Sequence, residues 1–415
     1  MIDTKVLTPW QIKLHNMHQF MNPIFSLNPE LFHTLLAKKG ANWMQNNVYA
    51  TQKIKELFAC TPEENALLKT QIFGQEYANP VGLAAGFAKE FDGLKTLEHM
   101  GFGYAVLGSV TFDAQPWNPK QRIKRVDDIK TLFNWMGLPW SGAQALAQKA
   151  EFLKQEWQRP KTMKTWISLA NSNIANNSLK WSEWEWFTVG KIETEDQHAK
   201  RKGLDLADSL SATYDHAEVF EVNVSCPNVH WWTSNQWASL DIILAIVQQR
   251  NQEEARIRNI SPKPIVIKIW PLTAETDPAK AEDITLETLT LIVDIAIKHG
   301  IKWITATNTS KERSGIENGK SLYPKWWMSG WQLYDQSLHT VQQLRKLLDE
   351  KNSDIIINWV GGIGCEWSLE NLSDNGLELY DAGADTLQIY SWLVAWSIIL
   401  PVALKKNLAT FKQYI

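Results

Sequence analysis

Short segments rich in β-branched residues alternate with longer segments of helical periodicity from residue 80 onward. This alternation is typical of parallel strands joined by crossover helices. The eight expected strands begin at Pro80, Gly103, Trp166, Val219, Ile265, Trp303, Ile355 and Ala384. Eight parallel strands, each followed by a helix, close into a barrel more often than they form an open sheet. The sequence therefore predicts an α/β fold of the (β/α)8 TIM barrel type.

A small helical extension is expected before the barrel, because a chain of 415 residues with 44% hydrophobic residues can bury more than one barrel core. Residues 1–76 are assigned to this N-terminal extension and residues 77–415 to the barrel. After Asn28-Pro29, an amphipathic helix is predicted from Leu31, Leu35 and Leu36. The ordinary interpretation is a helix that packs on the barrel; the alternative is a cap that faces the membrane or admits a quinone.

A polar, tryptophan-rich stretch over residues 171–201 has no steady periodicity and is predicted to be an insertion or lid.

Charge and composition exclude several classes of protein. A formal net charge of -3 gives no broad cationic surface, so nucleic acid is not an expected partner. The three cysteines show no metal-ligand spacing, which predicts no metal site and favours a reducing compartment. The first residues lack a signal-peptide pattern, and the longest apolar run, near Leu393, is too short to cross a bilayer. We expect a cytoplasmic protein, with peripheral contact on the inner face of the cell membrane if the extension is a cap.

Polar residues gather at the carboxyl ends of the predicted strands, where TIM barrels carry their functional groups. Inward lysines such as Lys89 and Lys268 predict an anionic ligand, because an unpaired buried charge is costly. Gly361-Gly362 and Tyr390-Ser391 follow the last two strands, where barrels commonly bind a phosphate. Cys226, at the end of the fourth strand beside Asn223 and Asn228, is predicted to be a reactive thiol rather than a buried apolar side chain.

Beyond these single residues, a series of motifs resembles the dihydroorotate dehydrogenase family from about residue 79 to the C-terminus. The motifs occur in the family's order and are NPVGLAAGFAKEFDG, MGFGYAVLGSVT, QPWNPKQR, FNWMGLP, NVSCPN, ITATNTS, MSGW, VGGIG and LQIYS.

The resemblance implies an FMN enzyme that oxidises (S)-dihydroorotate to orotate in pyrimidine biosynthesis. It implies that Cys226 is the base that removes the C5 proton while a hydride passes from C6 to flavin N5. The substrate-binding residues that it implies are Lys89, Asn134, Asn223, Asn228, Asn308 and Thr309. The cofactor-binding residues that it implies are Ala85, Ser109, Ser168, Asn223, Lys268, Thr307, Gly330, Gly361, Gly362, Tyr390 and Ser391. Two residues depart from the family's pattern, since Ala88 replaces an acid and Ser168 replaces an asparagine.

The resemblance gives two conflicting indications of the electron acceptor. The segment FSLNPELFH resembles the extension of the membrane-associated class that reduces quinones, whereas a cysteine base resembles the soluble class that uses fumarate or NAD. We predict a quinone, because a whole element is harder to gain or lose than one side chain. The alternatives are a fumarate- or NAD-linked enzyme and a non-catalytic barrel that binds a phosphate ligand.

Tryptophan is abnormally frequent, with 22 residues against 21 glycines. Several stand where the family has glycine, namely Trp117, Trp326, Trp327, Trp359 and Trp392. At such places glycine either adopts positive φ or lets the backbone touch a ligand, and an indole prevents both. Our hypothesis is that the gene uses UGA as a glycine codon; genuine divergence or a decayed paralogue are the alternatives.

The gene sequence tests this hypothesis directly. We expect UGA at the codons for Trp117, Trp327, Trp359 and Trp392, and glycine at these positions in the intact mass of the protein from its native host. UGG at these codons would end the idea.

Overall fold

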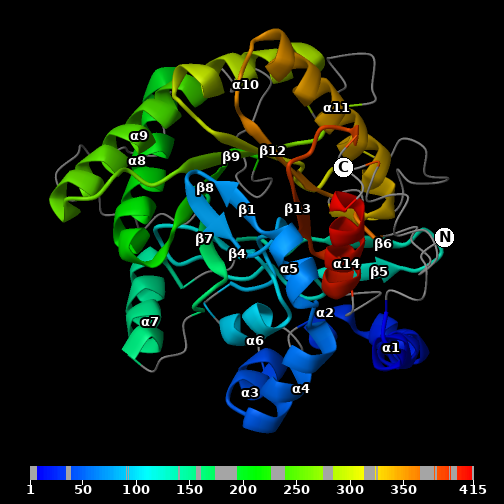
Figure 1. Cartoon of the computed structure of the whole chain (residues 1–415). Coiled ribbons are helices and arrows are strands. Elements are labelled where there is room, and N and C mark those ends of the chain that lie inside the picture. The colour runs from blue at the N-terminus through cyan, green and yellow to red at the C-terminus, as the bar shows by residue number, and fades with distance from the viewer. Residues whose placement is uncertain are drawn as a thin grey trace.

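A closed barrel of eight parallel strands forms the centre of the molecule (Figure 1). The computed structural model describes residues 7–33, 39–89, 91, 93–138, 141–155, 160–172, 194–225, 239–273, 284–312, 323, 326–364, 378, 381–391, 393 and 400–413. Neighbouring barrel strands follow the chain order, and β13 pairs with β3 to complete the circle. The predicted (β/α)8 TIM barrel is therefore confirmed.

Each of the eight expected strands is present. They are β3 (Val81–Leu83), β4 (Tyr104–Val110), β7 (Lys164–Leu169), β8 (Val219–Asn223), β9 (Ile265–Ile269), β10 (Trp303–Ala306), β12 (Ile356–Val360) and β13 (Thr386–Ile389). The helices around the barrel are α6 (Leu94–His99), α7 (Ala143–Gln155), α8 (Glu195–Thr213), α9 (Ser239–Arg258), α10 (Leu286–Lys298), α11 (Tyr334–Glu350) and α14 (Leu400–Lys412).

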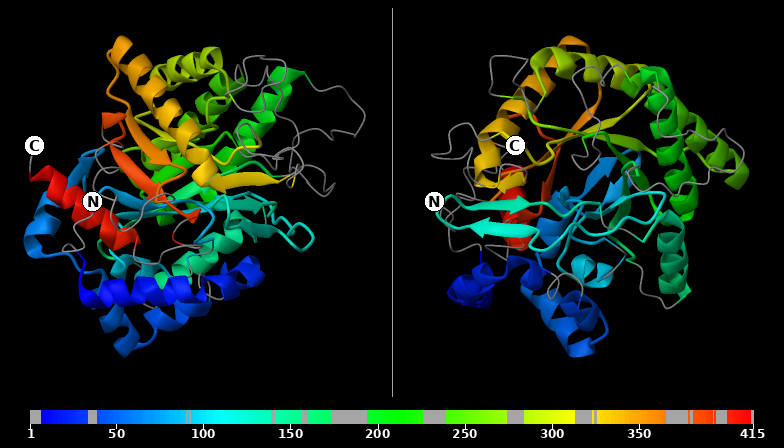
Figure 2. Two further views of the ribbon diagram at one scale, coloured as in Figure 1. Left: turned by 90° about the vertical axis from the view of Figure 1, so that its right-hand side faces the viewer. Right: turned by 180° about the vertical axis from the view of Figure 1, so that it is seen from behind.

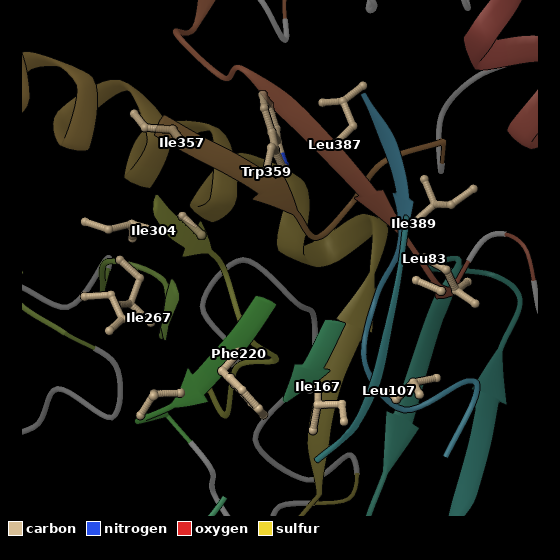
Figure 3. Packing of buried hydrophobic residues seen from close by; sticks show 14 of the residues in the cluster. Leu83, Leu107, Ile167, Phe220, Ile267, Ile304, Ile357, Trp359, Leu387 and Ile389 are labelled. Carbon is tan, nitrogen blue, oxygen red and sulfur yellow. The ribbon is translucent and has the colours of Figure 1, made fainter. Parts of the chain in front are cut away.

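Alternate residues of each strand face the helices and form the main core. Figure 3 shows this layer, in which Leu107, Ile167, Phe220 and Ile267 come from the neighbouring strands β4, β7, β8 and β9. All four side chains are buried. Because successive strand residues point to opposite faces, the residues between them must point into the barrel. The apolar outer layer thus fixes which side chains reach the interior.

Aromatic rings fill the amino end of the barrel. Trp166 stacks on Tyr104 with 4.4 Å between ring centroids, and Trp303 meets Trp166 edge to face at 4.5 Å. A hairpin of β1 (Thr70–Ile72) and β2 (Gln75–Tyr77) covers this end, and the Trp166 indole N–H donates to the Tyr77 hydroxyl (3.2 Å). Gly82 makes room for the rings, because a Cβ there would lie 2.2 Å from the Tyr104 ring. The barrel is closed at this end.

Among the described residues, the α-helices that precede the hairpin are α1 (Pro9–Leu27), α2 (Pro29–His33), α3 (Ala41–Gln45), α4 (Val48–Phe58) and α5 (Pro62–Leu68). The predicted helix start after Asn28-Pro29 is confirmed, since α2 begins at Pro29 and the Asn28 side chain accepts the Leu31 N–H (3.0 Å). Leu35 and Leu36 lie outside the described residues. Figure 2 shows α1, α3 and α4 at one end of the molecule.

A three-stranded antiparallel sheet lies beside the barrel and was not predicted. Its strands are β5 (Ile123–Val126), β6 (Thr131–Asn134) and β11 (Trp327–Gly330). Figure 2 shows β5 and β6 in cyan as an extended ribbon. The sheet is joined to the loop after β10 by the bridge between Met328 and Ser310, so it covers the carboxyl side of the barrel.

The boundary of the predicted insertion needs one correction. Residues 195–201 belong to α8, which begins at Glu195 with a capping box between Thr194 and Gln197. This box is readable in the sequence TEDQ, and it satisfies two backbone N–H groups at the helix start. Residues 173–193 lie outside the described part of the chain.

Within the described ranges, no helix combines the length and the apolarity that crossing a membrane requires.

Candidate active site at the carboxyl end of the barrel

Polar side chains from neighbouring strands form a hydrogen-bonded chain at the carboxyl end of the barrel. The Asn223 amide donates to the Ser109 hydroxyl (3.0 Å), which lies 3.2 Å from the Ser168 hydroxyl. The Asn308 side-chain amide donates to the Asn223 side-chain oxygen Oδ1 (3.3 Å). The structure therefore brings together predicted residues from β4, β7, β8 and the segment after β10. We call Ser109, Ser168, Asn223, Ser225 and Asn308 the polar ring.

Ser225 belongs to this ring but was not among the predicted residues. Its hydroxyl donates to the side-chain oxygen Oδ1 of Asn223 (3.1 Å) and to the backbone oxygen of Lys268 (3.0 Å), and the side-chain amide of Asn308 donates to the backbone carbonyl of Ser225 (2.7 Å). Ser225 thereby fixes the end of β8 against β9. It stands in the motif NVSCPN, two residues after Asn223, and this position could have indicated it.

Lys268 carries the main positive charge of the barrel interior. It lies on β9, is 95% buried, and forms no ion pair or side-chain hydrogen bond with the described residues. A buried ammonium without a partner is strongly disfavoured, so this position suits an electron-rich or anionic ligand.

Gly361 and Gly362 follow β12 with φ of 120° and 75°. A Cβ at Gly361 would lie 2.5 Å from the Ser337 hydroxyl, and one at Gly362 would lie 2.4 Å from the Tyr334 Cα. Both positions thus require glycine. Their backbone N–H groups make no hydrogen bond within the described chain, and amides arranged in this way commonly bind a phosphate.

Tyr390 and Ser391 follow β13 on the neighbouring side of this glycine segment. The Ser391 hydroxyl donates to the Ser329 hydroxyl on β11 (2.9 Å), which ties the antiparallel sheet to the barrel. Burial raises the pKa of the Tyr390 phenol, so this group stays protonated. Gly330 closes β11 with φ of 101°, and a Cβ there would lie 2.5 Å from the Lys130 backbone oxygen.

The remaining predicted residues surround the ring. Thr307 is buried, with its hydroxyl 3.0 Å from that of Ser337, and Thr309 donates its N–H to the Asn308 side chain (2.9 Å). Ala85 packs against the inward-facing aromatic cluster. Asn134 lies on β6, where its amide donates to the Trp327 carbonyl (3.4 Å) within the antiparallel sheet.

Comparison with known proteins gives this arrangement a family. Residues 67–411 match the family described as dihydroorotate dehydrogenase, which is most of the chain. The chain belongs to the dihydroorotate dehydrogenase family.

Family relatives are similar over nearly the full length. The chain is 29% identical over 349 residues to the dihydroorotate dehydrogenase (quinone) of Chloroflexus aurantiacus, covering 83% of each chain. It is 29% identical over 396 residues to that of Crocosphaera subtropica, covering 91% of this chain and 90% of the relative. Crystal structures of DHODH from Eimeria tenella, ligand-free and in complex with ferulenol, have the same fold, each with a TM-score of 0.68 and 22% identity over 92% of this chain. They are covered over 94% and 90% of their own lengths, respectively.

Two residues that this family resemblance assigns to catalysis and substrate binding, Cys226 and Asn228, lie outside the described residues. Their roles stay predictions. The described chain reaches Ser225, so Cys226 follows directly from a residue that the structure places in the polar ring.

Lys89, a predicted substrate-binding residue of this dehydrogenase, lies after β3 beside an aromatic ring. Its ammonium is 4.6 Å from the centroid of Trp117, and the Arg122 guanidinium is 4.3 Å from the same ring. Arg122 in turn donates to the Glu30 carboxylate of α2 (2.9 Å). Burial alone raises the pKa of Glu30, but the Arg122 hydrogen bonds outweigh burial and lower it. The extension is therefore tied to the side of the barrel that carries Lys89.

The described tryptophans at the family's glycine positions are Trp117, Trp326, Trp327 and Trp359, and none of them has positive φ. Trp359 is buried against α11 and its indole N–H donates to the Gly361 carbonyl (2.9 Å). Trp392 lies outside the described residues, and the codon hypothesis stays a prediction.

A buried carboxylate anchors the chain after β7. Asp205 of α8 accepts hydrogen bonds from the Ser172 N–H (2.7 Å), the Ser172 hydroxyl (2.8 Å) and the Asn171 amide (3.3 Å). Burial raises the pKa of Asp205 to about 6, although these hydrogen bonds favour the charged form.

This raised pKa predicts a pH-dependent stability. The protonated form is favoured by folding, so the Asp205 contribution is fully present below about pH 4 and is lost as the pH rises through about 6. We expect wild type to lose about 3 kcal/mol of unfolding free energy as the pH rises from well below 4 to well above 6, relative to Asp205→Asn, measured by urea denaturation. Asp208→Asn, on the same helix, is the control. Identical pH profiles for Asp205→Asn and wild type would contradict this assignment.

Proposed function

We propose that this protein oxidises (S)-dihydroorotate to orotate, uses FMN as its cofactor and passes the electrons to a quinone. Family membership and the polar ring at the carboxyl end of the barrel support the reaction. The single observation that carries the proposal is Lys268, a buried cation without a described partner beside paired asparagines.

The residues present fit FMN. Flavin supplies the hydride acceptor of the reaction. Lys268 would compensate electron density on the flavin ring, and Ser109, Ser168 and Thr307 would line its edge. The amides of Gly361 and Gly362 would hold the phosphate, because both N–H groups make no hydrogen bond within the described chain.

The substrate site follows from charge and hydrogen-bonding capacity. A pyrimidine carboxylate needs a cation and amide partners, and we assign these roles to Lys89 and to Asn134, Asn223, Asn228 and Asn308. Asn223 and Asn308 already orient each other. Cys226 would remove the C5 proton, and its attachment to Ser225 favours a position at the mouth of the barrel.

A quinone is the acceptor that the extension favours. The relatives from Chloroflexus aurantiacus and Crocosphaera subtropica are both named as quinone enzymes. The extension contacts the mouth through Glu30 and Arg122, which suits an acceptor that enters from that side. Apolar side chains of the extension are exposed, including Phe20 at 81% and Val48 at 87%. These residues favour peripheral contact with the inner face of the cell membrane.

The activity assay tests this function and its alternatives together. Purified protein at full flavin supply is expected to be yellow, to bleach on adding dihydroorotate, and to recover colour faster with ubiquinone or menaquinone analogues than with fumarate or NAD. Faster recovery with fumarate or NAD would reassign the acceptor. Colourless protein that still binds phosphate ligands would favour the non-catalytic barrel.

Cys226→Ala tests the base. We expect FMN content to be unchanged and the rate of flavin bleaching by dihydroorotate to fall by roughly 10²–10⁴-fold, as is typical when a general base is lost. Cys60→Ala is the matched control, because Cys60 lies outside the barrel mouth and should leave the rate unchanged. Undiminished bleaching in Cys226→Ala would remove Cys226 from this role.

A further inference from the structure

A cavity lies away from the polar ring, between the extension and the outside of the barrel. Its volume is about 710 Å³, within the range of small-molecule sites. Its walls come from α4, α5, α6, the segment before β7, and α14. Figure 1 shows α4, α5, α6 and α14 on the same side of the molecule.

Positive charge predominates in this cavity. Its lining contains Lys55, Lys95, Lys161 and Lys405, and its one carboxylate is Glu98. Glu98 is already engaged, since one of its oxygens accepts the N–H groups of Lys161 and Thr162 (both 2.6 Å) and the Thr162 hydroxyl (2.9 Å). A concave surface with charges of one sign concentrates ligands of the opposite sign. The whole chain has a net charge of -3, so this concentration of lysines is a local feature.

Acidic side chains of the described chain do not neutralise the rim lysines of this cavity. Lys55, Lys95 and Lys161 form no ion pair with any residue that the structure describes. His99 also lines the cavity, and burial, followed by the charges of Lys55 and Lys95, lowers its pKa. The imidazole therefore adds no charge near neutral pH.

Lys405 is the strongest sign of a ligand. It lies on α14, is 97% buried, and its ammonium donates to the Phe58 carbonyl (3.2 Å) and contacts the Cys60 thiol. No carboxylate of the described chain is within ion-pair distance. The nearby charges outside the lining are Glu64 and Lys406, which have opposite signs, and the Glu64 carboxylate accepts the Thr61 N–H (2.7 Å). A buried ammonium with only neutral partners is incompletely compensated.

We propose that this cavity binds a phosphate group, with Lys405 at its base and Lys55, Lys95 and Lys161 at its rim. Amide and hydroxyl side chains in the lining, such as Asn46, Asn65 and Thr51, suit the polar body of a phosphorylated metabolite. The same chemistry would suit the headgroup of an anionic lipid, because Val48 of the lining is exposed at the end of the molecule that carries the apolar side chains.

Binding is measured on the full chain loaded with FMN and orotate, so that the barrel's own anion sites are filled. Calorimetric titrations use inorganic phosphate, uridine monophosphate and adenosine monophosphate. Vesicles of phosphatidylglycerol and of phosphatidylcholine are compared by sedimentation. The variants are Lys55→Gln with Lys95→Gln, and separately Lys405→Met. The matched control is Lys53→Gln with Lys69→Gln, because these lysines are paired with Glu56 and Glu76 outside the cavity.

We expect Lys55→Gln with Lys95→Gln to weaken binding at least roughly tenfold, because charge-assisted contacts are lost, while the control variant leaves binding unchanged. If the variant weakens binding of a free phosphate compound, the ligand is soluble. If it weakens binding of phosphatidylglycerol vesicles alone, the ligand is a lipid headgroup. If no probe binds, or if the variant and the control bind alike, the proposal is wrong. Should Lys405→Met fail to fold, the double variant still decides the question, because Lys55 is exposed and Lys95 is half-buried.

Discussion

Closure of the barrel between β13 and β3 is the constraint on which the rest of the structure depends. The Leu387 N–H donates to the Pro80 carbonyl (3.0 Å), and the Ala84 N–H donates to the Ile389 carbonyl (3.1 Å). These bonds remove both sheet edges and set one register for the whole circle. All eight carboxyl ends then meet at one mouth, which brings Ser109, Asn223 and Asn308 into contact although they are distant in sequence.

Below that mouth, the interior changes from apolar to polar in layers. The amino end holds the rings of Tyr104, Trp166 and Trp303, and above them the Thr305 hydroxyl donates to the buried Glu221 carboxylate (3.0 Å). Asn358 joins Thr305 to the Tyr104 hydroxyl. Because this network is buried and its members hold one another, it supports the strands that carry Asn223 and Lys268. Precise placement at the mouth thus depends on packing far from it.

The sequence was most informative where a periodic pattern and a fold rule acted together. Strand alternation gave the barrel, and the rule on carboxyl ends gave most of the residues that now surround the polar ring. The antiparallel sheet of β5, β6 and β11 was missed because two of its strands are adjacent in the chain but the third, at Trp327, is a long-range partner. The start of α8 was missed although Thr194 and Gln197 signal it, because the preceding segment is irregular in composition. Asn134 was chosen by motif, and its role stays a prediction; only the structure shows that it stands on this sheet rather than on a barrel strand.

The aromatic rings at the amino end of the barrel determine where ligands enter. Because Tyr77, Trp166 and Trp303 fill that end, molecules that exchange electrons in the barrel enter and leave at the carboxyl end. The Glu30–Arg122 contact places α2 beside the carboxyl end of the barrel. Through Arg122 and Trp117, the extension thus lies on the same side of the barrel as Lys89.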